Sequence, residues 1–227
     1  MEDELALSYQ CYENSAYWGI VFFDLNLMNE NTLLKNTKKR DAFLDHLAFQ
    51  HKKLVIRSRK KMLLIKNPPH TARIKNLLTL YPEARFIFLI RNPYEVFFSM
   101  KKLWSKINKN YGLRNIQKDK LAEIIYKHYH TLMGAYENEK GLIPTQNLLE
   151  VRYEDLIRNP IHVLNRVYKK FNLEFPEKLY NTTLGFSDSS KRYQRSNYKF
   201  DTDSIEEIYE QLKDYIEKWK YSAPISI

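Results

Sequence analysis

The 227-residue sequence holds a single cysteine, Cys11, and no long run of apolar residues. One thiol excludes an internal disulfide and a zinc site built on several cysteines. No segment approaches the roughly 20 apolar residues that a membrane-spanning helix needs. The first residues, MEDELALSYQ, are acidic and lack the basic-then-apolar order of a secretory leader. These absences favour a cytoplasmic protein without a membrane span.

Glycine is also scarce, which bears on nucleotide binding. The five glycines stand far apart, and none is followed by Thr-Thr or by Lys-Ser/Thr: they are Gly19, Gly112, Gly134, Gly141 and Gly185. A phosphate-binding loop of the Walker type clusters glycines so that backbone N–H groups can surround the phosphates. The sequence therefore contains no such loop.

The composition is that of a globular protein with a basic balance. Hydrophobic residues make up 44% and charged residues 28% of the chain, which predicts a packed domain rather than disorder. The length suits one domain, and we expect it to span residues 1–227. The formal net charge of +10 favours anionic partners such as phosphates, sulfates, nucleic acid or a membrane surface.

The hydrophobic pattern predicts strands that alternate with helices. Short apolar runs at residues 62–66, 85–90 and 148–153 are typical of buried strands. Apolar residues at helical spacing predict helices at 31–54, 71–81, 93–106, 121–136, 160–171 and 203–220. This alternation favours an α/β fold with a largely parallel sheet flanked by helices. In such sheets, ligands bind beyond the carboxyl ends of the strands.

Polar side chains follow each predicted strand and are candidates for one site. Lys66, Arg91 and either Arg152 or Tyr153 stand at or just past strand ends, and Ser99 lies about two turns into the helix after Arg91. Arg91 could hold a phosphate by two hydrogen bonds, and His70 could act as a general base. The spacing alone also fits an arginine at a sheet edge and solvated side chains in a proline turn.

Two segments together resemble the sulfotransferases that use 3′-phosphoadenosine 5′-phosphosulfate (PAPS). The first is KNPPHTARIKNLLTLYPEARFIFLIRNPYEVFFSM, residues 66–100, with its Lys-x-Pro, Arg-Asn-Pro and a serine eight residues after the arginine. The second is LLEVRYEDLIRNPIHVLNRVYKKFNLEF, residues 148–175, with Tyr-Glu-x-Leu after a strand. The resemblance is to the broad branch that includes tyrosylprotein and carbohydrate enzymes. It implies a P-loop-containing, nucleotide hydrolase-like sulfotransferase fold.

The resemblance also implies roles for individual residues. Arg91 and Ser99 would hold the 3′-phosphate of the nucleotide, and Tyr153 would lie against the nucleotide. Lys66 would contact the transferring sulfuryl group or the leaving 5′-phosphate. His70 would deprotonate a hydroxyl or amine acceptor, although some branches of the family use a glutamate on an early helix instead. No metal is required.

A basic segment near the C-terminus would complete the nucleotide site. Residues 191–199, KRYQRSNYK, stand where the family places a segment that covers the nucleotide. Within it, Arg192 and Arg195 are the candidate nucleotide ligands.

The sequence departs from the family pattern at one point. The family begins with a strand and a loop, Pro-Arg/Lys-Ser/Thr-Gly-Thr-Thr, that holds the 5′-phosphosulfate, and this sequence has no such loop. We therefore expect an N-terminally incomplete fold that lacks its first strand. A parallel sheet missing a strand exposes an apolar edge, so we expect an oligomer or a partner to cover it.

Two other functions remain open at this point. A chain without the loop could be a non-catalytic relative that serves as a binding module. The basic runs 38–40 and 57–61 are compatible with a nucleic-acid-binding protein, although the sequence contains none of the usual nucleic-acid motifs. A metal site has little support, because His128 and His130, two residues apart, diverge on a helix.

Overall fold

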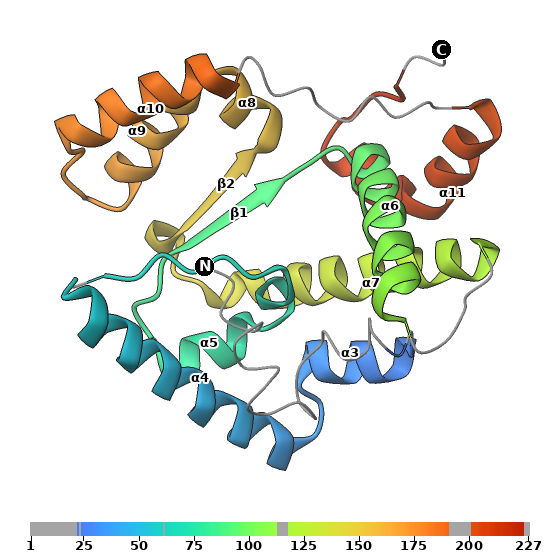
Figure 1. Cartoon of the computed structure of the whole chain (residues 1–227), viewed down its shortest axis with the longest axis horizontal. Helices are drawn as coiled ribbons and strands as arrows, with labels where there is room; N and C mark the ends of the chain where they lie inside the picture. The colour runs from blue at the N-terminus through green and yellow to red at the C-terminus, as the bar shows by residue number, and fades with distance from the viewer. Residues whose placement is uncertain (1–21, 23, 61, 113–117, 191–200, 225–227) are drawn as a thin grey trace. The chain divides into compact units, whose positions relative to one another are not determined.

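The computed structural model describes residues 22, 24–60, 62–112, 118–190 and 201–224 (Figure 1). The described chain forms two compact units. One comprises the described residues within 22–83 and 100–143, and the other comprises the described residues within 84–99 and 144–224. We call them the first and second units and describe each by itself. The single domain expected over residues 1–227 stays a prediction.

The first unit is helical. Its elements are α3 (Leu25–Leu33), α4 (Thr37–Ser58), η2 (Pro68–Ala72), α5 (Ile74–Leu80), the later part of α6 (Pro93–Tyr111), α7 (Lys118–Glu139) and η3 (Lys140–Leu142). The 3₁₀ turn η2 packs against α7 and α3, and α4 packs against α5. The core of this unit includes Met28, Phe43, Leu47, Ala72 and Ile125.

The helix expected over 31–54 is in fact two helices. Leu34 adopts a left-handed conformation with φ 50° and ends α3. The Asn36 side chain then accepts a hydrogen bond from the backbone N–H of Lys39 at 3.1 Å and begins α4. A left-handed residue followed by an N-cap is a regular way to end one helix and start the next.

A buried arginine joins η2 to the end of α3. Arg73 is 1% exposed, and it donates hydrogen bonds to the backbone oxygens of Asn31 and Thr32, both at 2.8 Å. Its guanidinium carbon also lies 4.6 Å from the centroid of the Phe43 ring. The last carbonyls of a helix have no partners within the helix. Arg73 therefore closes α3 and fixes η2 on it.

The second unit is built on a parallel pair of strands, β1 (Phe86–Ile90) and β2 (Leu148–Arg152). Phe86 pairs with Leu148, and Ile90 pairs with Arg152. The other elements of this unit are the first seven residues of α6, η4 (Thr145–Asn147), α8 (Tyr153–Arg158), α9 (Pro160–Lys170), α10 (Glu177–Ser190) and α11 (Thr202–Lys218). Figure 1 shows the two strands side by side, with α8 directly after β2.

The structure confirms the strands expected near 85–90 and 148–153 and their parallel direction. The strand expected at 62–66 is wrong, because those residues have no regular structure and the described sheet holds only β1 and β2. Met62 and Leu64 are 56% and 82% exposed. A strand needs a hydrogen-bonded neighbour, and an apolar run alone does not provide one.

Candidate functional site

The carboxyl ends of the two strands bring Arg91 and Tyr153 together. Ile90 and Arg152 are paired in register, so the residues that follow them leave the sheet at the same edge. The Arg91 guanidinium carbon lies 4.6 Å from the centroid of the Tyr153 ring. A guanidinium over an aromatic ring keeps its in-plane N–H donors available to an anion. Both residues were predicted from the sequence to bind the nucleotide.

Glu95, in the first turn of α6, makes an ion pair with Arg91. Nη2 and Nε of Arg91 lie 3.0 Å and 3.3 Å from Oε2 of Glu95, and the two side chains are 30% and 28% exposed. The guanidinium has five N–H donors, and the ion pair with Glu95 uses Nη2 and Nε but not Nη1. The pair orients Arg91, and it also sets a carboxylate beside the position where an anion would bind.

The turn between β1 and α6 is held by two side chains. Asn92 begins α6 as its N-cap, because its Oδ1 accepts the backbone N–H of Tyr94 at 3.1 Å. The backbone N–H of Asn92 donates to Oε1 of Glu154 at 3.2 Å. The turn that carries Arg91 is therefore fastened to the start of α8. Two backbone N–H groups at this helix end are thus already bonded to the protein's own side chains.

Tyr221 binds the second carboxylate oxygen of Glu154. Its hydroxyl donates to Oε2 of Glu154 at 2.8 Å. Burial, then the hydrogen bond to Glu154, raises the pKa of Tyr221, so the phenol stays protonated and remains a donor. The Arg152 guanidinium carbon lies 4.7 Å from the centroid of the Tyr221 ring, and its Nη2 donates to the backbone oxygen of Trp219.

A hollow of about 340 Å³ adjoins Tyr221. It is lined by Tyr94 and by residues from α11 onward, among them Tyr209, Glu206 and Glu210. Two carboxylates at its wall make the hollow unsuited to a phosphate or sulfate. An anion at this edge of the sheet would therefore bind on the Arg91 side.

The other predicted site residues are placed as follows. Ser99 is half-buried and is the seventh residue of α6, so it stands almost two turns past Asn92. Lys66 is exposed and His70 is half-buried, and both belong to the first unit. Arg192 and Arg195 lie outside the described residues.

His70 stands on a well-anchored turn. Its backbone N–H donates to the backbone oxygen of Asn67 at 3.1 Å, and its own backbone oxygen accepts from Arg73 at 3.1 Å. Asn67 is 8% exposed, and Arg73 is the buried arginine bound to α3. These hydrogen bonds fix the backbone of the chain at His70.

Sequence reasoning missed Glu95, Glu154 and Tyr221. Glu95 stands four residues after Arg91, a spacing at which opposite charges meet on a helix. Glu154 is the glutamate of the Tyr-Glu-x-Leu motif, for which only the tyrosine was given a role. No sequence signal links Tyr221 to either residue, because its contact spans 67 positions.

Among the residues that the structure describes, no group of three or more His, Cys, Asp or Glu side chains is arranged to hold a metal ion. No helix in the described part is both long and apolar enough to cross a membrane.

The sequence is similar to known sulfotransferases. The sequence model of the sulfotransferase family matches residues 13–177. The omega-hydroxy-beta-dihydromenaquinone-9 sulfotransferase Stf3 of Mycobacterium bovis is 28% identical over 163 residues, which are 72% of this chain and 42% of that protein. The Stf3 protein of Mycobacterium tuberculosis matches to the same extent. The chain therefore spans less than half the length of these relatives.

Solved structures share the fold at low sequence identity. The sulfotransferase STF1 of Mycobacterium tuberculosis is 15% identical with a TM-score of 0.58, covering 82% of this chain and 51% of that chain. STF9 of Mycobacterium avium is 16% identical with a TM-score of 0.57, covering 70% and 42%. The fold is thus the α/β sulfotransferase fold, as the sequence predicted. With a family match over most of its length, the chain belongs to the sulfotransferase family.

Proposed function

We propose that this protein takes part in sulfuryl transfer from PAPS to a hydroxyl or amine acceptor. The observation that carries the proposal is the stacked pair of Arg91 and Tyr153 at the carboxyl ends of β1 and β2. That edge is where sheets of this class bind ligands. The guanidinium of Arg91 could bind a phosphate of the nucleotide, and the Tyr153 ring could pack against its adenine base.

The roles proposed for the individual residues follow from their chemistry. Arg91 and Ser99 hold the 3′-phosphate by charge-assisted and hydroxyl hydrogen bonds. The acceptor oxygen or nitrogen attacks sulfur, the bond from sulfur to the 5′-phosphate oxygen breaks, and adenosine 3′,5′-bisphosphate leaves. His70 takes the acceptor proton, and Lys66 stabilises the charge that develops on the departing oxygen.

The relatives support a hydroxyl as the acceptor group. The mycobacterial Stf3 proteins are named for an omega-hydroxy substrate, and they are similar to this chain over 163 residues. We extend to this chain only the acceptor class, a hydroxyl. Arg192 and Arg195 belong to the same proposal as nucleotide ligands, as does a cytoplasmic location.

The decisive experiment compares two nucleotides by isothermal titration calorimetry. Adenosine 3′,5′-bisphosphate should bind, and Arg91→Ala should weaken it about 10- to 100-fold, the value of one charged hydrogen-bonded contact. Adenosine 5′-monophosphate, which lacks the 3′-phosphate, should bind weakly and respond little to Arg91→Ala. Arg158→Ala, which removes an exposed arginine of α8, is the matched control. Equal losses in both variants, or no binding by the native chain, would reject the site.

A non-catalytic binding module is the second candidate. It is favoured by the sequence observation that no phosphosulfate-binding loop is present. Transfer of radiolabelled sulfate from PAPS to a panel of alcohols and amines separates the two functions. Nucleotide binding without transfer indicates the module, and transfer that is lost in Lys66→Ala and His70→Ala indicates the enzyme. Steeply salt-dependent binding of random oligonucleotides would instead favour a nucleic-acid-binding protein.

We also propose that another chain covers the sheet. Ile87 and Leu89 of β1 are 42% and 44% exposed, which is unusual for a parallel strand. Light scattering after size-exclusion chromatography should show an oligomer. A monodisperse monomer that is soluble at high concentration would contradict this part of the proposal.

A further inference from the structure

The second half of α4 presents two large apolar side chains to solvent. Phe49 is 56% exposed and Ile56 is 76% exposed. They are seven residues apart and therefore lie on nearly the same side of the helix. The opposite side is buried in the first unit and carries Phe43, Leu44, Leu47 and His51. Phe49 and Ile56 are thus not part of the core that α4 helps to form.

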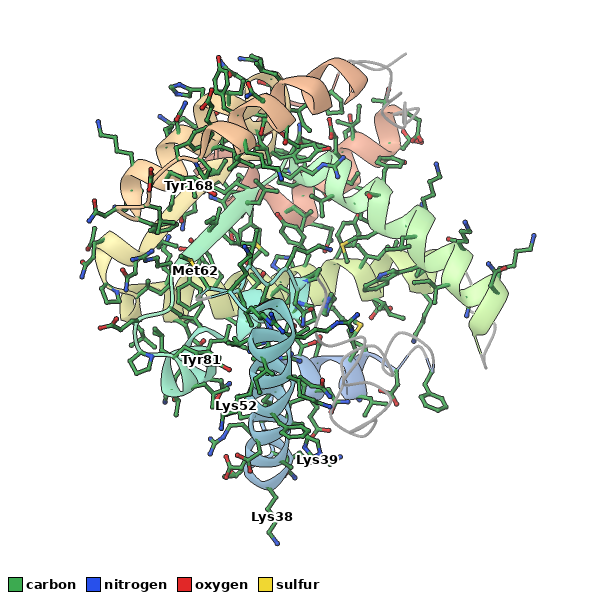
Figure 2. The ribbon with its side chains drawn as sticks, turned by 60° about the vertical axis from the view of Figure 1, so that its left-hand side comes forward. Lys38, Lys39, Lys52, Met62, Tyr81 and Tyr168 are labelled. Carbon is green, nitrogen blue, oxygen red and sulfur yellow. The ribbon has the colours of Figure 1, made fainter. Side chains whose placement is uncertain are left out.

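Lysines flank these two side chains. Lys52 and Lys53 are exposed and stand three and four residues after Phe49, within one turn of it. Nζ of Lys53 lies 4.6 Å from the centroid of the Phe49 ring. Figure 2 shows Lys38, Lys39 and Lys52 along α4. We call Phe49, Lys52, Lys53 and Ile56 the α4 face.

The α4 face belongs to the most basic part of the sequence. Residues 46–82 contain nine Lys or Arg and no Asp or Glu. The rest of the chain holds 28 Lys or Arg against 27 Asp or Glu, so this segment supplies nine of the ten net positive charges. The first acids before and after it are Asp45 and Glu83. The excess of positive charge therefore lies in the same stretch of sequence as the exposed apolar side chains, although Arg73 within it is buried.

The combination of charge and apolar side chains selects the partner. A second copy of this chain would set like charges opposite one another, which is unfavourable. The phosphates of a nucleic acid would attract the lysines, but a nucleic acid has no apolar surface against which the aliphatic side chain of Ile56 could pack. An anionic bilayer satisfies both, because its charged headgroups lie above an apolar interior. Lysines can lie along such a surface with their ammonium groups at headgroup level.

We propose that the α4 face binds the surface of an anionic membrane, with Phe49 and Ile56 inserted below the headgroups and Lys52 and Lys53 among them. Asp41 and Asp45, on the first half of α4, confine the contact to the second half. The contact is peripheral and leaves the helix in the plane of the surface. This proposal does not depend on sulfuryl transfer.

Vesicle sedimentation tests the proposal with the full chain. Vesicles of phosphatidylglycerol and phosphatidylcholine should bind it at about 0.1 M salt, and pure phosphatidylcholine vesicles should not. Each lysine at such a surface contributes about fivefold to binding, so Lys52→Glu with Lys53→Glu should lower it roughly 25-fold or more. Phe49→Ser with Ile56→Ser should lower it about tenfold or more, since the inserted area is lost.

Control variants at other exposed positions test whether binding depends on the α4 face or only on the overall charge and exposed apolar area of the protein. Leu103 and Leu142 are 54% and 52% exposed, so Leu103→Ser with Leu142→Ser removes comparable apolar area elsewhere. Lys106→Glu with Lys109→Glu makes the same charge change on exposed positions of α6. Both control pairs should bind anionic vesicles within about twofold of the native chain.

Three results would overturn the proposal. One is equal binding to neutral and anionic vesicles, or no binding to either. Another is a loss on charge reversal with no loss in Phe49→Ser, Ile56→Ser, which would indicate a purely electrostatic surface such as one for nucleic acid. The third is an oligomer that this apolar double variant dissociates, which would assign the α4 face to a second copy of the chain.

Discussion

The Arg91 guanidinium lies over the Tyr153 ring, with 4.6 Å between the guanidinium carbon and the ring centroid. The two residues are 62 positions apart in the sequence, and the register of Ile90 with Arg152 brings them together. The contact orients a cation at the edge of the sheet where we propose that a nucleotide binds.

Replacing Tyr153 tests whether the ring contributes to nucleotide binding. Tyr153→Leu removes the cation–π contact and the surface on which a base could stack. We expect adenosine 3′,5′-bisphosphate to bind about 3- to 30-fold more weakly, in keeping with about 0.5–2 kcal/mol for such a contact. Tyr153→Phe keeps the ring and should stay within about twofold. Calorimetry on the three proteins measures the difference, and an equal loss in both variants would assign the effect to the hydroxyl.

Removing the Glu95 charge should strengthen nucleotide binding. The carboxylate of Glu95 lies 3.0 Å from Nη2 of Arg91 and would repel a phosphate bound there. Glu95→Gln keeps the shape of the side chain, and we expect severalfold tighter binding of adenosine 3′,5′-bisphosphate at low salt. The gain should shrink at about 1 M salt, where the Debye length is about 3 Å. Weaker binding in Glu95→Gln would show that the ion pair mainly positions Arg91.

The hydrogen bond between Tyr221 and Glu154 should contribute measurably to stability. Glu154 accepts from both Tyr221 and the backbone of Asn92. Tyr221→Phe removes one of these donors and should lower the free energy of unfolding by about 1.5–3 kcal/mol, typical of a hydrogen bond to a charged group. A double-mutant cycle with Glu154→Gln, followed by urea unfolding, isolates the pair. A coupling energy near zero would contradict the assignment.

Acid should destabilise the first unit through His128. Its ring is buried, its Nδ1 lies 3.2 Å from Oδ1 of Asn29, and it contacts the Trp104 ring. Burial lowers the pKa of His128 to about 4. The unfolded chain takes up a proton near pH 6.5 and the folded chain does not until about pH 4. Protonation therefore lowers the free energy of unfolding as the pH falls through this window, by about 3 kcal/mol at most.

Urea unfolding between pH 7 and pH 4.5 measures this slope. His128→Leu should start less stable, because its contact with Asn29 is lost, but its stability should fall less steeply with acid. His162→Gln, at an exposed position of α9, is the control and should keep the native slope. A parallel slope in His128→Leu would assign the acid sensitivity to other groups.

Much of the fold could be predicted from local patterns. The runs at 85–90 and 148–153 form β1 and β2, and the apolar stripes after 93, 121 and 160 form α6, α7 and α9. The run at 62–66 is equally apolar and forms no strand. Local sequence encodes the tendency to extend, but backbone pairing requires a neighbouring strand that the pattern does not specify.

The candidate site likewise combines residues that local motifs predict with residues that only long-range contacts bring in. Arg91 and Tyr153 were found because each follows a strand within a recognisable motif. Glu95, Glu154 and Tyr221 were missed because their importance lies in contacts made across the fold. Tyr221 in particular reaches Glu154 from the residues that follow α11, where Trp219 also lies beside Phe88 of β1.

The sequence by itself determined the family, the parallel strand pair, the concentration of positive charge in residues 46–82 and the arginine at the strand end. These features depend on the types of residue and on their short-range spacing, both of which can be read from the sequence. Tertiary structure alone decided that Arg91 stacks on Tyr153, that Glu154 joins the Asn92 turn to Tyr221, and that Phe49 and Ile56 face solvent. Those relationships depend on strand register and on which helix face is buried, and both are settled only when distant parts of the chain pack together.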